Sequence, residues 1–266
     1  MGPKLLKSMP PGSHIKWAAH DVIERGDRAF ERFAPMHNLW QAIAEMFYPE
    51  RADFTSQTAI GDERYWDIFD EEAMLLRRNL ANQIGAMIRP RGRDWFMCRA
   101  FPRQLNKIDD VRLWCEYATL VHRDVIYSAG ANFSKAMSQS DNDYVAFGTS
   151  VIKHTYNFDK TGLLFQCGHP RDFAWNEHAD GSMDMHERMK MPMIQLDQMG
   201  FVIPKGLLER YQNNPHEEIE VRRCTYPIAF YGGGDKLPRE AKYAVMYVAH
   251  GCREELKPKS GNPTFF

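Results

Sequence analysis

The sequence has 266 residues, of which 44% are hydrophobic and 26% are charged, and its formal net charge at pH 7 is −1. This length and composition are typical of a globular protein with a sizeable core, arranged as one large domain or two small ones. Proteins that grip many phosphates of a nucleic acid usually carry a clear basic excess. The balanced charge therefore argues against tight DNA binding by the monomer. It is compatible only with binding through a local basic patch.

The chain has five cysteines, whose odd number and wide spacing argue against a disulfide framework and favour a reducing cytoplasm. No two cysteines form a CxxC pair, so the sequence contains no zinc ribbon. The apolar runs are short, whereas a membrane-spanning helix needs about 20 apolar residues. We therefore expect neither a signal peptide nor an association with a membrane.

The first predicted element is a long helix that follows a flexible arm over residues 1–20. Apolar side chains at three- and four-residue spacing predict this helix from Asp21 to Tyr48. Pro49 ends the pattern, and Pro35 inside it could kink or split the helix.

A second helix is predicted from Asp70, a good N-cap residue, to the region of Arg89, where Pro90 and Gly92 follow. The short apolar run at residues 95–98 (WFMC) is then read as a strand, because its residue types favour extended structure.

The clearest helical period in the chain runs from Asp109 to Ser128. Its apolar residues are expected to form one stripe facing the core, and they are Val111, Trp114, Cys115, Ala118, Val121, Val125 and Ile126. A further helix is expected from residue 132 toward Phe147.

After Gly148 the periodicity changes to strands and turns. Two hairpins are predicted, one from strands at 149–156 and 163–167, and one from strands at 173–177 and 183–191. Short helices at 192–199 and 204–211 and strands at 217–230 and 242–250 follow.

The predicted fold class is α+β, with a helical N-terminal half and a mainly antiparallel β region, since the elements do not alternate as in a βαβ chain. The expected parts are residues 21–148, residues 149–255, and a connector over residues 256–266 that points to a truncated chain.

Two glycine-containing motifs resemble catalytic loops but fit turns better. The sequence DKTG at residues 159–162 is similar to the phosphorylation motif of cation-pumping ATPases, but Leu163 follows where those enzymes have threonine, and these residues also suit a hairpin turn. The sequence GGGDK at residues 232–236 lacks the serine or threonine that completes a phosphate-binding P-loop.

The histidines and cysteines form only weak candidate sites. Cys167 with His169, and His178 with His186, are too few ligands for a structural metal site. Cys98 and Cys115 lie in apolar patterns that favour packing over nucleophilic chemistry. We therefore expect no catalytic residue, no metal site and no cofactor.

The sequence RPRGR at residues 89–93 places three arginines in five residues. Arg89, Arg91 and Arg93 are the candidate contacts for phosphate or for a partner, because a guanidinium binds phosphate through two hydrogen bonds. The alternative is a solvated loop at a helix C-terminus, where cations are favoured in any case.

Five stretches in a fixed order carry a resemblance to a known family. They are residues 39–51 (LWQAIAEMFYPER), 67–70 leading into 79–84, 88–96 (IRPRGRDWF), 134–152 with AFGTSV at 146–151, and 180–188 continuing to 195–196. In these stretches the chain resembles the portal, or head-to-tail connecting, proteins of short-tailed, podovirus-type bacteriophages. The resemblance runs from about residue 25 to the end of the chain.

This resemblance implies a structural protein and not an enzyme. Portal subunits form a homo-oligomeric ring, typically of twelve copies, at one vertex of the capsid in the virion, after assembly in the host cytoplasm. Double-stranded DNA is packaged and ejected through the ring, and the partners are the capsid protein, the terminase motor and tail adaptor proteins. The chain would correspond to the N-terminal wing region, without most of the stem, clip and crown.

Two other functions remain open from the residues alone. The first is a nucleic-acid-binding module that uses the arginines at 89–93, which predicts salt-sensitive DNA binding by the monomer. The second is an unrecognised hydrolase with scattered His, Asp and Cys residues, which predicts a deep pocket where two such groups converge.

Overall fold

The computed structural model describes residues 19–56, 61, 68, 70–90, 92–157, 161–228, 242–259 and 264–265. The chain forms two compact units, one from residues 1–35 with 172–266 and one from residues 36–171. We call them the sheet unit and the helical unit. Helix α1 (Ala19–Phe47) contributes its first part to the sheet unit and its second part to the helical unit. The units therefore interleave along the chain, whereas the predicted parts follow one another.

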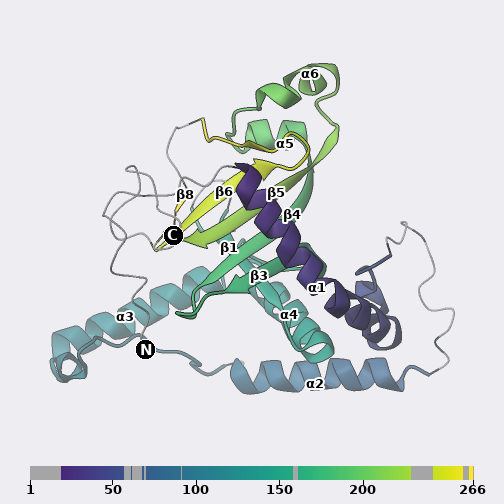
Figure 1. The fold of residues 1–266 in the computed structure, drawn as a ribbon. Coiled ribbons are helices and arrows are strands. Elements are labelled where there is room, and N and C mark those ends of the chain that lie inside the picture. Colours follow the sequence, from purple (N-terminus) through teal and green to yellow (C-terminus); the bar gives the residue numbers. More distant parts are fainter. Residues whose placement is uncertain are drawn as a thin grey trace, which may run out of the picture. The chain divides into compact units, whose positions relative to one another are not determined.

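The sheet unit contains an antiparallel sheet with strand order β3-β4-β5-β6-β7, and β8 also pairs with β6 (Figure 1). Its strands are β3 (Phe173–Glu177), β4 (Met183–Pro192), β5 (Glu218–Pro227), β6 (Tyr243–Ala249), β7 (Glu254–Glu255) and β8 (Thr264–Phe265). Two short helices, α5 (Met193–Gln198) and α6 (Lys205–Asn213), connect β4 to β5.

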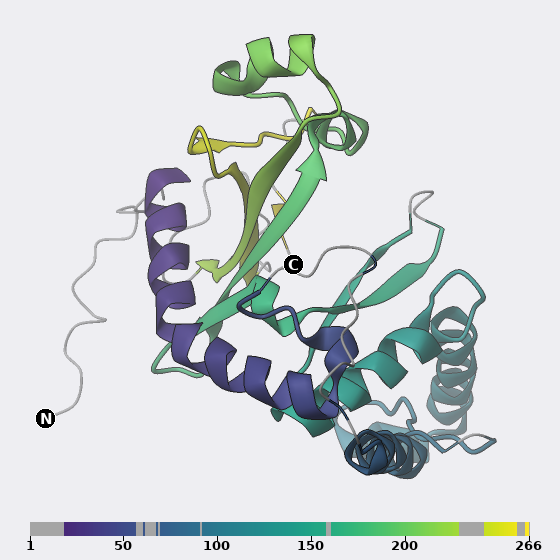
Figure 2. The ribbon, with the colours of Figure 1, turned by 90° about the vertical axis from the view of Figure 1, so that its right-hand side faces the viewer.

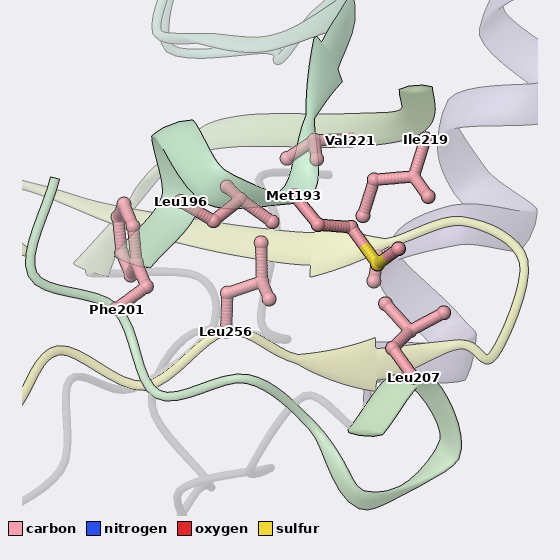
Figure 3. Packing of buried hydrophobic residues seen from close by; sticks show 8 residues of the cluster. Met193, Leu196, Phe201, Leu207, Ile219, Val221 and Leu256 are labelled. Carbon is pink, nitrogen blue, oxygen red and sulfur yellow. The ribbon is translucent and has the colours of Figure 1, made fainter. Parts of the chain in front are cut away.

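The two faces of this sheet are covered by different helices because side chains alternate along a strand. On β5, Val221 belongs to a cluster with α5 and α6, whereas Cys224 belongs to a cluster with Val22 and Ile23 of α1. The first cluster consists of Met193, Leu196, Phe201, Leu207, Ile219, Val221, Ala249 and Leu256 (Figure 3). The first part of α1 runs along the opposite face (Figure 2).

The contact between α1 and the sheet also includes buried polar groups. Arg25 donates through Nε to Asp184 Oδ2 at 2.7 Å, and Arg222 donates through Nη2 to Asp27 Oδ1 at 3.0 Å. A β-carbon at Gly26 would lie 3.0 Å from Nδ1 of His186, so glycine at this position permits the close approach of helix and strand. The helix is therefore attached by ion pairs as well as by apolar contacts.

In its described residues, the helical unit contains the second part of α1, three further helices and one hairpin. Its helices are α2 (Glu72–Ile88), α3 (Asp109–Ile126) and α4 (Phe133–Phe147), its strands are β1 (Val151–Tyr156) and β2 (Leu163–Gly168), and its 3-10 turns are η2 (Pro49–Arg51) and η3 (Arg103–Lys107). A third turn, η4 (Pro170–Asp172), leads into β3. Helix α4 packs against α2 on one side and against β1 and β2 on another.

An aromatic cluster forms the centre of the helical unit. The ring of Phe54 lies 5.6 Å from Trp40, 5.0 Å from Phe147 and 4.7 Å from His169, measured between ring centroids. Such tilted and edge-on contacts are favourable for aromatic pairs. The cluster joins α1, α4 and the segment after β2, which are far apart in the sequence.

The structure confirms the α+β class and most of the predicted elements. The four long helices, both hairpins, the two short helices and the strands near 217–230 and 242–250 are all present. Pro35 lies inside α1 without splitting it, and the Asp70 carboxylate accepts a hydrogen bond from the backbone N–H of Glu72 at 2.9 Å at the start of α2. Among the described residues, no helix is both long and apolar enough to cross a membrane.

Two predictions about local structure are wrong. Residues 95–98 do not form a strand, because no strand in the described part of the chain pairs with them, and the backbone N–H of Cys98 instead donates to Thr119 Oγ1 at 2.9 Å. The apolar stripe of α3 is not a core stripe either: Cys115 is buried, but Trp114 beside it is 67% exposed. Residues 1–18 of the predicted arm, the glycine loop at 232–236 and residues 159–160 of the DKTG turn lie outside the described residues.

Candidate interaction surface

Arg89 and Arg93, the two described residues of the predicted arginine cluster, have different environments. Arg89 follows the end of α2 and forms an ion pair with Asp141 of α4, in which both side chains are largely buried. Arg93 is exposed, and Arg91 lies outside the described residues. The guanidinium of Arg89 is therefore engaged in holding α2 on α4, while Arg93 is open to solvent.

Helix α3 has its apolar face turned to solvent. Cys115 and Thr119 are its buried residues, and they lie on the side that packs against the rest of the unit. The opposite side has six large apolar side chains at helical spacing, Leu113, Trp114, Tyr117, Leu120, Val121 and Val125, all exposed. A contiguous apolar face of this kind is a candidate site of interaction with another protein.

A second apolar surface lies on α2. It is a hollow of about 600 Å³, formed by the end of α1, the first part of α2 and the end of α4. Its apolar lining residues are Ile43, Phe47, Ala73, Leu76, Leu80, Val145 and Ala146, and its charged ones are Asp70, Glu72 and Arg77. Arg77 is engaged within the unit, because its guanidinium stacks on Tyr48 at 3.7 Å and donates to Asn142 Oδ1 at 2.9 Å.

The described lining of the hollow has two carboxylates, Asp70 and Glu72, as its acidic groups. No histidine, cysteine or serine is among its described lining residues, so it does not bring together the His, Asp and Cys set expected for the alternative hydrolase function. A smaller pocket of about 170 Å³ in the sheet unit includes His250 and Glu220 but no cysteine or serine. Among the described residues, neither of these two pockets is lined by a cysteine or serine together with a histidine.

The cysteine and histidine predicted as weak metal ligands in the helical unit lie beside a buried ion pair. Cys167 Sγ is 3.3 Å from Asp143 Oδ2, and burial, followed by the negative charge of Asp143, raises the pKa of this thiol to about 12. His169 lies 3.3 Å through Nε2 from the carbonyl oxygen of Arg51, and burial lowers its pKa to about 3, with the charges of Arg51 and Arg171 acting in the same direction. A protonated thiol is a poor nucleophile, so this environment does not activate Cys167.

The second weak metal pair lies in the sheet unit, and its members have separate environments. His178 Nε2 is 2.8 Å from Asp184 Oδ1, whereas His186 is 2% exposed and burial lowers its pKa to about 4. Among the residues that the structure describes, the one group with metal-ligand geometry is His20 with Asp21 and Glu24, all exposed at the start of α1. Exposed groups of this composition are common without an ion.

Cys98 contacts a histidine instead of packing in a core. Its Sγ lies 3.3 Å from Nδ1 of His122 on α3, at the surface of the helical unit. The contact was not evident from the sequence, because Cys98 and His122 are 24 residues apart and no helical or strand spacing connects them. Similarly, the exposed face of α3 has the spacing of an ordinary amphipathic helix, which does not reveal which side is buried.

Comparisons with known proteins identify the family. No curated protein matches the sequence. A family model described as "Bacteriophage head to tail connecting protein" matches residues 19–261, which include every helix and all but the last two-residue strand described above. The chain, with its two α+β units and the exposed apolar helices of the helical unit, belongs to the family of bacteriophage head-to-tail connecting proteins.

Proposed function

We propose that the chain is the wing part of a structural subunit of a ring-shaped portal, typically of twelve copies, through which double-stranded DNA is packaged and ejected. The family match supports a structural connecting role in a phage particle. The proposed place is the portal vertex of the capsid, after assembly in the host cytoplasm. The proposed partners are the capsid protein, the terminase motor, tail adaptor proteins and further copies of the chain.

The exposed apolar face of α3 is the observation that most directly supports the proposed ring. A closed ring requires heterologous contacts, in which each subunit uses two different faces. The helical unit has two separate apolar surfaces, the α3 face and the hollow beside α2. In Figure 1, α2 and α3 extend to opposite sides of this unit, as a head-to-tail contact requires.

The charge balance supports DNA passage without tight binding. The net charge is −1, and a strongly basic wall would trap DNA, because releasing many counterions stabilises the complex. Of the predicted phosphate contacts Arg89, Arg91 and Arg93, the first is already paired with Asp141. Arg93 is the described arginine of this set that could contact DNA or a partner.

Mass measurement and negative-stain images of the purified protein test the ring. Rings with a central hole, and a mass that is a multiple of the 30.9 kDa chain, are expected. A stable monomer at high protein concentration would overturn the proposal. Duplex DNA provides the second test, for which we expect weak, salt-sensitive binding, and a nanomolar affinity at low salt would contradict the proposed sliding of DNA.

A further inference from the structure

The segment that precedes α3 combines exposed apolar and basic side chains. Phe101 is 93% exposed, more than any other large apolar residue described, and Met97, Leu105 and Ile108 beside it are exposed as well. The same segment contains the exposed cations Arg99, Arg103 and Lys107, none of which forms a salt bridge with a described residue. We call residues 97–108 the basic loop.

The basic loop is held in a defined shape. The Asn106 side chain accepts a hydrogen bond from the backbone N–H of Ala100 and donates one to its carbonyl oxygen, both at 2.9 Å. These two bonds close the loop between residues 100 and 106 at the position where Phe101 projects. A preorganised loop loses less conformational entropy on binding than a flexible one.

The hollow beside α2 is complementary to the basic loop, because it combines an apolar lining with acidic residues. Asp70 and Glu72 line it and Glu71 lies between them, and all three side chains are exposed without a salt bridge to a described residue. The hollow itself is mainly apolar, and its volume of about 600 Å³ falls in the range of ligand pockets, roughly 300–1,000 Å³. It can therefore accept large apolar side chains. We call the three acids at its edge, Asp70, Glu71 and Glu72, the acidic rim.

We propose that the basic loop of one copy of this chain docks into the α2 hollow of the next copy, with Phe101 and Leu105 in the hollow. Arg99, Arg103 and Lys107 then lie against the acidic rim of Asp70, Glu71 and Glu72. This proposal rests on the proposed ring and names the contact that closes it.

The choice of a second copy follows from charge and position. Three cations in one surface and three anions in the other favour this pairing and disfavour contact of either surface with itself. Asp109 and Asp110 follow the loop but do not cancel its positive charge. Asp109 is paired with Arg112 at 3.1 Å. Both acids also occupy the first turn of α3, where the helix dipole stabilises negative charge. The exposed face of α3 begins where the loop ends and extends the same contact.

The test uses two charge-reversal variants of the whole chain. One has Glu71→Lys with Glu72→Lys, which makes the rim basic and leaves the Asp70 hydrogen bond in place. The other has Arg103→Glu with Lys107→Glu, which makes the loop acidic. Each variant alone brings like charges together, so we expect the protein concentration needed for half assembly to rise by at least about tenfold.

An equimolar mixture of the two variants is the decisive measurement. In the mixture, the basic loop of the first variant meets the acidic rim of the second, and the acidic loop of the second meets the basic rim of the first. Assembly is therefore expected to recover to alternating rings. Matched controls reverse two exposed charges of the sheet unit, Lys190→Glu with Lys205→Glu or Glu209→Lys with Glu218→Lys, and should assemble as the unaltered chain does.

The apolar part of the contact has its own variant. Phe101→Ser removes the aromatic side chain proposed to enter the hollow but leaves the charges, so it should reduce assembly. Because Phe101 is solvent-exposed, the circular dichroism of the monomer should not change. If the unaltered chain forms rings but the reversal variants assemble equally well, or the mixture does not recover, this contact is wrong and the ring stands. If the unaltered chain stays monomeric, both the ring and this contact are wrong.

Discussion

Arg51 binds Asp143 through two parallel hydrogen bonds, Nε to Oδ1 at 3.1 Å and Nη2 to Oδ2 at 2.9 Å, and the Asp143 side chain is completely buried. The two residues are 92 positions apart, and their pairing joins the turn after α1 to the centre of α4. Burial raises the pKa of the Asp143 carboxyl, and the Arg51 guanidinium opposes that shift. The buried charge of Asp143 therefore depends on Arg51.

Removing one partner of this ion pair should destabilise the helical unit strongly. Arg51→Met leaves a buried carboxylate without its cation, and we expect the free energy of unfolding to fall by about 3–5 kcal/mol. Urea denaturation of the monomer measures this change. The double variant Arg51→Met with Asp143→Leu should recover a large part of the loss, and a double variant as unstable as the single one would contradict this account.

Stability should fall as the pH is lowered below about 6.5. The folded pKa of His186 is about 4 because of burial, below its ordinary value of 6.5, so in this window the unfolded chain binds a proton that the folded chain does not. Each such proton lowers the free energy of unfolding by at most about 1.4 kcal/mol per pH unit. His169, with a pKa of about 3, should extend the decline to lower pH.

Denaturation curves between pH 4 and pH 8 check this dependence. His186→Gln should flatten the slope between about pH 4 and 6.5, because the titrating group is lost. His154→Gln, which replaces an exposed histidine on β1, is the control for the replacement of one histidine by glutamine. An unaltered slope in the His186 variant would show that other groups cause the acid sensitivity.

The arginines at 89 and 93 should respond differently to substitution. Arg89→Ala removes a charged hydrogen bond to Asp141 inside the unit and should lower the free energy of unfolding by about 1.5–3 kcal/mol. Arg93→Ala alters only an exposed side chain and should change it by less than about 0.5 kcal/mol. Thermal or urea denaturation of both variants distinguishes them. Equal effects would mean that Arg89 is not held by Asp141.

The exposed face of α3 should affect assembly and not folding. Trp114→Ser with Tyr117→Ser removes two side chains that are 67% and 66% exposed, so the free energy of unfolding of the monomer should change by less than about 1 kcal/mol. The mass of the assembled protein should fall toward that of the monomer. Arg28→Ser, which changes an exposed side chain on the first part of α1, should leave the mass unaltered. Loss of stability in the monomer would show that the α3 face is packed within the chain.

Local sequence spacing determined the helices, the hairpins and the α+β class of this protein. The helical period of α1 to α4 and the turn residues of the two hairpins depend on near neighbours in the chain, so they could be predicted. The family resemblance was also present in the sequence, in the order of stretches between residues 39 and 196, and the family match confirms it.

The tertiary structure alone decided which surfaces and polar groups are buried. Periodicity shows that α3 has an apolar side but not whether the chain covers it, and the structure leaves that side exposed. The run at residues 95–98 has strand composition but forms no strand, because a strand requires a hydrogen-bonded neighbour. Arg89 looked like a free cation until its partner Asp141, 52 residues away, was known. Burial and ion pairing are properties of residues that meet in space, which is why local spacing could not determine them.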